Sequence, residues 1–199
     1  MMNNRVCELV CTRLSHDVIG NVGAVANAVE LLEEGDMDFI DDIKSILKAS
    51  SFNLSARLKF FRLAFGLDNP TIKDRQAVVE TARNYLASIG NKDYPIDLIF
   101  DVWNSDCYRT ALQLMMVMAD IMPRGGILKI VETDNKLRAI IGKETKIAAE
   151  KLERISAAID KKSTGIDASL APLYSLIETL GAEKICLEHN SDSIVLVVG

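Results

Sequence analysis

The sequence lacks any run of about 18 apolar residues, the length that a membrane-spanning helix needs. Its first residues, MMNNRVCELVCTRLSHD, carry charge throughout and have no apolar stretch of the kind found in a secretory signal. Cysteines occur only at positions 7, 11, 107 and 186, without a CxxC pair, which disfavours a disulfide framework and a zinc ribbon. We therefore expect a cytoplasmic protein with no membrane segment, whose cysteines are small buried hydrophobic residues.

Positive charge is also scarce in this chain. The 23 Lys and Arg residues are outnumbered by 28 Asp and Glu residues, so the formal net charge is -5 and the sequence pI is near 5.1. Nucleic acids and anionic lipids present negative surfaces that repel such a protein, so we expect neither to be a partner. Hydrophobic residues make up 49% of the sequence, which is enough for a folded core and excludes a disordered tail protein.

The first third of the sequence carries a strong helical pattern. Apolar residues recur at spacings of three and four over 6–32 and again over 39–65. Two helices of about 30 residues would form an antiparallel hairpin. Each helix has a wide apolar face that one hairpin cannot cover, so the pattern predicts a homodimer in which two hairpins form a four-helix bundle. We assign residues 1–68 to this dimerisation domain.

The pattern changes after Pro70 to a mixture of helices and strands, which predicts a second domain over residues 71–199. Helices are expected at 74–89, 106–122, 145–159 and 170–180, and strands at 96–102, 127–133, 136–141, 184–188 and 193–198. Asp134 and Asn135 suit a hairpin turn between two of these strands. The fold class is therefore α+β, with helices on one face of a mixed or antiparallel sheet.

His16 is the first candidate for chemistry. It lies in the middle of the first helix, off the apolar stripe and on the same face as Arg13, Gly20, Gly23 and Asn27, so it is expected to face solvent. The two glycines each cost the helix about 1 kcal/mol relative to alanine. Their missing side chains would let another protein approach the imidazole closely.

An exposed imidazole suits phosphoryl transfer. The neutral ring is nucleophilic and forms a phosphoramidate that readily gives up its phosphoryl group. Asp17 could orient or deprotonate the ring, and Arg13 could neutralise phosphoryl charge. An incidental surface histidine, a solvated acid at Asp17, and an Arg13 paired with Asp17 or Glu8 are the alternatives. The two cysteines near His16 lack the spacing of metal ligands, and no metal site is expected.

The segment 14–25, LSHDVIGNVGAV, is followed by Asn27, Glu30, Leu31 and Leu32, and together these residues resemble the ChpT histidine phosphotransferases of alphaproteobacteria. That family has a helical hairpin like the dimerisation domain of sensor histidine kinases, followed by a degenerate kinase ATP-binding domain. The resemblance extends along the whole chain: segment 123–126, PRGG, is similar to the end of a kinase's ATP-site helix. Segment 169–179 is similar to the helix after its glycine-rich lid.

The sequence departs from the kinase pattern in two ways. Asn21 stands where kinases and this family usually carry proline. The predicted helix 106–122 offers no asparagine for magnesium, and no Asp-x-Gly-x-Gly or glycine-rich lid occurs between Gly142 and Leu170. Nucleotide phosphates would find no cradle there, so no ATP binding is expected.

The resemblance implies a phosphotransferase with a phosphohistidine intermediate and without ATP-dependent kinase activity. It implies no cofactor of its own, because the partner receiver domains bring the aspartate and the Mg²⁺. The implied donor is the receiver domain of a CckA-like hybrid kinase, and the implied acceptors are CtrA-like and CpdR-like response regulators in cell-cycle regulation. The alternatives are an ATP-dependent histidine kinase-like protein and a non-enzymatic scaffold or anti-kinase that binds a receiver or a kinase.

The candidate site residues follow from this reading. We predict that His16 and Asp17 are catalytic. We predict that the residues contacting the receiver share the exposed face of His16: Arg13, Gly20, Gly23, Ala24 and Asn27. The second domain is expected to help hold the receiver beside His16.

Overall fold

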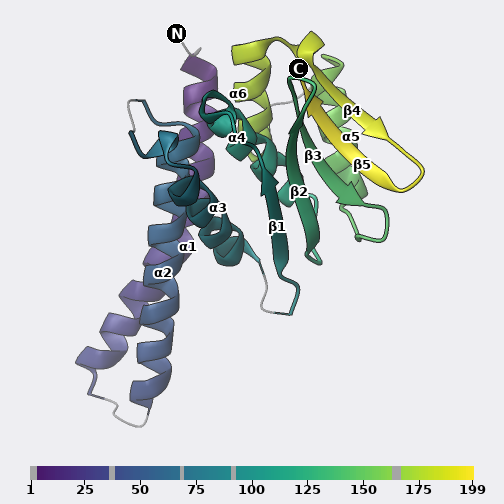
Figure 1. The fold of residues 1–199 in the computed structure, drawn as a ribbon. Helices are drawn as coiled ribbons and strands as arrows, with labels where there is room; N and C mark the ends of the chain where they lie inside the picture. The colour runs from purple at the N-terminus through teal and green to yellow at the C-terminus, as the bar shows by residue number, and fades with distance from the viewer. Residues whose placement is uncertain (1–3, 36–38, 68–69, 91–92, 163–166) are drawn as a thin grey trace.

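The computed structural model describes residues 4–35, 39–67, 70–90, 93–162 and 167–199. Two long helices, α1 (Asn4–Glu33) and α2 (Ile40–Ala64), run antiparallel and form a hairpin whose far half projects from the rest of the molecule (Figure 1). Ile43 of α2 and Ala28 of α1 are buried in this hairpin. The hairpin predicted from the spacing of apolar residues is therefore present.

A five-stranded mixed sheet forms the other side of the molecule. Its strands are β1 (Ile96–Asp101), β2 (Gly126–Thr133), β3 (Lys136–Gly142), β4 (Ile185–His189) and β5 (Ser193–Val198), in the order β1-β2-β3-β5-β4. β1 runs parallel to β2, and the other neighbouring pairs are antiparallel. Asp134 and Asn135 both have positive φ, 53° and 58°, which a tight two-residue hairpin turn requires. The predicted turn is confirmed.

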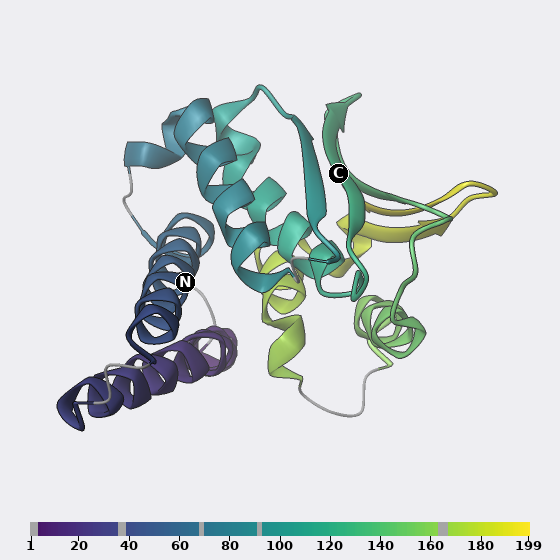
Figure 2. The ribbon, with the colours of Figure 1, turned by 90° about the horizontal axis from the view of Figure 1, so that it is seen from below.

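Four further helices lie on one face of the sheet (Figure 2): α3 (Arg75–Ile89), α4 (Tyr108–Ala119), α5 (Ala149–Ile159) and α6 (Ala171–Leu180). Short 3₁₀ turns, η2 (Pro70–Lys73), η3 (Ser105–Cys107), η4 (Ala168–Leu170) and η5 (Ala182–Lys184), precede α3, α4, α6 and β4. This arrangement confirms the α+β fold class. None of the helices in the described ranges combines the length and apolar character needed to cross a membrane.

One continuous core joins the hairpin to the sheet. Phe60, Phe61 and Leu63 at the end of α2 pack into the same buried cluster as Met115 of α4 and Leu128 of β2. α4 is the centre of this cluster, because nearly every side chain along it is buried. The core therefore crosses the division that the sequence predicts after residue 68, and the inner end of the hairpin packs against the α/β part.

The expectation that the cysteines are buried is wrong. Cys7, Cys11 and Cys186 are exposed, and Cys107 is half-buried. Cys186 alternates with the core residue Ile185 along the edge strand β4, so it lies on the face of the sheet opposite the helices. Cysteine count alone gave no information on which side of each element the thiol would lie.

Candidate functional site

His16 lies on the open side of α1. Its side chain is 86% exposed, as the helical spacing predicts. Gly20, Gly23 and Asn27 on the same face are exposed too, and Ala24 is half-buried. A Cβ atom added at either glycine would meet no other heavy atom within 4 Å. The helix surface next to the imidazole is therefore open at Gly20 and Gly23, where a second protein can approach the ring closely.

Asp17 lies beside His16 but belongs to the interior. Its Oδ1 is 3.6 Å from Nδ1 of His16, which is within ion-pair range if the ring is protonated and too long for an ordinary hydrogen bond. The residue is buried, and its two carboxylate oxygens accept hydrogen bonds from Nε of Arg13 at 3.1 and 3.0 Å. The alternative of a solvated surface acid is excluded by this environment.

The expectation that Arg13 shares the exposed face of His16 is wrong. Its side chain is only 12% exposed, and its guanidinium turns toward the α/β part of the chain. Nη1 and Nη2 each donate to a carboxylate oxygen of Asp120 at 2.8 Å, and Nη1 also donates to the carbonyl oxygen of Ser169 at 3.0 Å. Arg13 is thus occupied by partners inside the molecule and is not available to a docked phosphoryl group.

The charge of Arg13 is secured by this environment. Burial lowers the pKa of the guanidinium, but the hydrogen bond with Asp120 and the negative charges of Asp120 and Asp17 outweigh burial and raise the pKa above its usual value. Arg13 is therefore a permanent cation shared by two carboxylates.

Asp120 is a site residue that the sequence reading missed. It is the residue that ends α4, and its side chain is 14% exposed. The C-terminal end of a helix carries partial negative charge, so a carboxylate is unfavourable there unless a cation compensates for it. An acid at the end of a strongly apolar helix is the signal that could have marked it, but its partner lies 107 positions away in the sequence.

Two more polar side chains lie beneath α1. The guanidinium of Arg57 in α2 donates to the backbone oxygens of Asp17 and Ser88, the latter at 2.8 Å. The hydroxyl of Tyr85 in α3 is buried and has no hydrogen-bond partner among the described residues. Burial raises the pKa of Tyr85, and the charge of Asp120 acts in the same direction, so this phenol stays neutral. The flank of α1 that carries Arg13 and Asp17 therefore lies against a polar cluster.

Asn21 has a structural role at the position where the related families usually carry proline. Its Oδ1 accepts a hydrogen bond from Nδ2 of Asn53 at 3.3 Å, which connects α1 to α2. α1 continues through this position from Asn4 to Glu33. An asparagine keeps the backbone N–H that a proline would remove, so the helical hydrogen bonding is not interrupted there.

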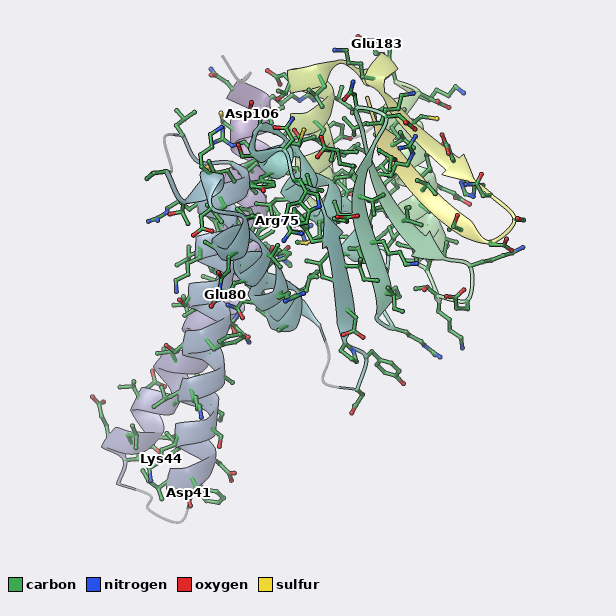
Figure 3. All side chains as sticks on the ribbon, viewed as in Figure 1. Asp41, Lys44, Arg75, Glu80, Asp106 and Glu183 are labelled. Carbon is green, nitrogen blue, oxygen red and sulfur yellow. The ribbon has the colours of Figure 1, made fainter. Side chains whose placement is uncertain are left out.

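The hairpin carries exposed apolar side chains along its length. Figure 3 shows the far half of the hairpin projecting beyond the rest of the molecule, with Asp41 and Lys44 near its tip. The large apolar side chains exposed along α1 and α2 and at their ends are Ile19, Val22, Val29, Leu31, Leu32, Phe39, Ile46, Phe52 and Leu58. A surface of this kind is typical of a contact with another protein.

The described residues contain no group of three or more His, Cys, Asp or Glu side chains placed to hold a metal ion. Beside His16, the charged side chains of Asp17, Arg13 and Asp120 form a chain of alternating sign. It is able to hold a carboxylate beside the ring while the outer side of the ring stays open.

Comparison with known proteins gives two informative results, although no family model matches the sequence. The chain is 31% identical to the protein phosphotransferase ChpT of Brucella abortus (strain 2308), over 94% of this chain and 91% of the relative. The fold matches the 1.7 Å structure of a bacterial phosphotransferase with a TM-score of 0.75. That match covers 100% of this chain and 98% of the other at 24% sequence identity, so it speaks for the fold alone.

Proposed function

The chain belongs to the ChpT family of protein phosphotransferases, and from this premise we propose that it is a histidine phosphotransferase whose His16 carries a phosphoryl group between receiver domains of a phosphorelay. The observation that supports this assignment is the exposed imidazole on a helix face left open by Gly20 and Gly23. A receiver domain needs such an opening, because its phosphorylated aspartate has to come within bonding distance of the ring.

In the proposed reaction, Nε2 of neutral His16 attacks the phosphorus of the receiver's aspartyl phosphate. The P–N bond forms, the P–O bond breaks, and the aspartate leaves as a carboxylate; the reverse step loads the next receiver. Nε2 is the reactive atom because Nδ1 lies on the side of Asp17. With Nδ1 protonated and Nε2 phosphorylated, the ring is cationic, and the Asp17 carboxylate at 3.6 Å stabilises that charge. The Mg²⁺ belongs to the receiver in this proposal.

The exposed apolar side chains of the hairpin support a homodimer. Val22 and Val29 are exposed on one face of α1, two helical turns apart, and Ile46 is exposed on α2. Pairing two hairpins into a four-helix bundle would remove these side chains from water. The dimer predicted from the sequence is part of this proposal.

We retain Gly20, Gly23, Ala24 and Asn27 as proposed receiver contacts, because they lie along the open face of His16. Arg13 is withdrawn from this set. A cytoplasmic location, the CckA-like donor, the CtrA-like and CpdR-like acceptors and a role in cell-cycle regulation stay predictions that rest on the resemblance.

The decisive experiment is transfer of label from a phosphorylated receiver domain of a hybrid histidine kinase. We expect the wild type to take up the label and His16→Gln to take up none. The matched control is His189→Gln, because His189 is the second of two histidines in the sequence and is also exposed. Label on the His16→Gln variant would refute the assignment.

The same preparation distinguishes the two alternatives. Incubation with labelled ATP alone is expected to give no phosphohistidine, and incorporation of label would instead favour a kinase. Stable binding of the receiver with no transfer in either direction would favour a scaffold.

A further inference from the structure

A single guanidinium connects the phosphoacceptor region of α1 to the end of α4. Nε of Arg13 donates to Asp17, while Nη1 and Nη2 donate to the two oxygens of Asp120. Four of its hydrogen bonds thus go to carboxylate oxygens, and the carbonyl oxygen of Ser169 accepts a fifth from Nη1. Because the guanidinium is planar, fixing one edge on Asp120 also fixes the direction in which Nε points at Asp17.

Asp120 is held at a locally unfavourable position. It follows the last turn of α4, where the helix dipole disfavours a carboxylate. Lys151 does not bond its carboxylate: Nζ of Lys151 donates to the backbone oxygen of Asp120 at 3.1 Å. Arg13 is the cation that compensates for the carboxylate, and it belongs to the same helix as His16.

We propose that Asp120 is a positioning residue for the phosphoacceptor: it holds Arg13, which holds the Asp17 carboxylate on the Nδ1 side of His16. This inference rests on the proposed function of His16. The carboxylate favours the neutral tautomer that carries its proton on Nδ1, and this tautomer leaves the lone pair on Nε2, the atom that faces the receiver. The α/β part thereby acts on the imidazole through charge, without touching it.

The test is the tautomer of His16 in the unphosphorylated full-length protein, read from the ¹⁵N chemical shifts of the ring. The sequence contains only two histidines, so His189→Gln assigns the His16 signals directly. We expect the wild type to favour the Nδ1-protonated form and Asp120→Asn to shift the population toward the Nε2-protonated form. Phosphoryl uptake from a receiver should fall roughly tenfold, the size typical of losing a group that orients a reactive residue indirectly.

Three further variants separate positioning from mere stability. Asp120→Glu keeps the charge and should restore much of the tautomer preference. In an Asp17→Asn background, Asp120→Asn should cause no additional shift, because its effect passes through Asp17. Asp106→Asn removes an exposed carboxylate that pairs with Lys73 far from Arg13, and it should leave both readouts unchanged.

The proposal would be overturned by a wild-type tautomer population in Asp120→Asn, or by additive effects of Asp17→Asn and Asp120→Asn. If Asp120→Asn does not fold, Arg13→Lys replaces it, because lysine keeps the charge but lacks the fork that holds two carboxylates; an unchanged tautomer there also overturns the proposal. The NMR readout needs no receiver. If His16 failed to accept a phosphoryl group, the proposed function would be refuted, whatever the tautomer measurement shows.

Discussion

The ring of Phe60 in α2 stacks on the ring of Tyr85 in α3, with 3.9 Å between centroids and 16° between planes. Both side chains are completely buried. The phenol of Tyr85 is close enough to the polar cluster that holds Asp17 for the charges of Arg13 and Asp17 to act on its pKa. The hairpin and the α/β part are thus joined by an apolar contact next to a charged one.

Tyr85→Phe should raise the free energy of unfolding by about 1 kcal/mol, because the variant keeps the ring stack and removes a buried hydroxyl that has no partner among the described residues. Urea denaturation measures the change. Tyr108→Phe is the control, since its hydroxyl donates to the carbonyl oxygen of Trp103 at 3.3 Å and its loss should not stabilise the fold. A Tyr85→Phe variant less stable than the wild type would contradict this prediction.

Gly20 should show opposite effects on stability and on transfer. Gly20→Ala is expected to raise the free energy of unfolding by about 1 kcal/mol, because the space around the Cβ position is open and alanine favours the helix. Gly20→Leu should slow phosphoryl uptake from a receiver about tenfold or more, equivalent to about 1.4 kcal/mol of lost docking energy.

Phosphoramidate serves as a small phosphodonor that separates access from chemistry. His16 in the Gly20→Leu variant should react with it at the wild-type rate, and the exposed position Glu153 of α5 provides the control Glu153→Leu. If Gly20→Leu slowed the phosphorylation of His16 equally with the receiver and with phosphoramidate, the substitution would be distorting the helix rather than blocking the receiver.

Val29→Lys should weaken the proposed dimer at least about tenfold, because a lysine charge would have to be desolvated in the four-helix bundle. Sedimentation equilibrium measures the association. Ile127→Lys is the matched control. It places the same charge at a similarly exposed apolar position away from the hairpin, because Ile127 is 48% exposed on the sheet and Val29 is 43% exposed on the hairpin. Equal dissociation constants for the wild type and Val29→Lys would rule out a dimer through this face.

Asp167 should make the fold sensitive to acid. Burial raises the pKa of its carboxyl, but hydrogen bonds from Ser169 and Arg154 outweigh burial and hold the pKa below its usual value. Because the unfolded-state pKa of an aspartate is about 3.9, this carboxylate stabilises the fold above that pH, and the contribution disappears as the pH falls through the lower folded-state value.

Asp167→Asn should therefore be less stable than the wild type near pH 7 by urea denaturation, and the two stabilities should converge as the pH falls below the lowered pKa of Asp167. If the difference in free energy of unfolding between the wild type and Asp167→Asn were as large in acid as at pH 7, the contribution of Asp167 would come from its side-chain geometry and not from its charge.

The sequence was sufficient for most of the architecture, because periodicity is a local property. Apolar spacing located all six helices described above, and alternation located the five strands to within a few residues. The exposed position of His16 followed from the same spacing, since a helix fixes which side chains share a face.

Contacts between distant segments were beyond that reasoning. Arg13 lies on the flank of the His16 face, and a long flexible side chain can turn to either side of the helix; the position of Asp120 decides which. The burial of Asp17 follows from the same contact. Local spacing cannot foresee a partner 107 residues away, so the ionic connection between the two parts appeared only in the structure.

The packing of Phe60 and Phe61 against the α4 side of the sheet has a consequence for docking. Tilting the inner end of the hairpin would expose aromatic rings to water, and this cost opposes a change in the angle between α1 and the sheet. A rearrangement that lets a bulky partner fit would cost least in the partner itself or in the far half of the hairpin, which lies outside this core. Successive partners would accordingly meet the same fixed geometry, and selectivity among them would have to reside in their own surfaces.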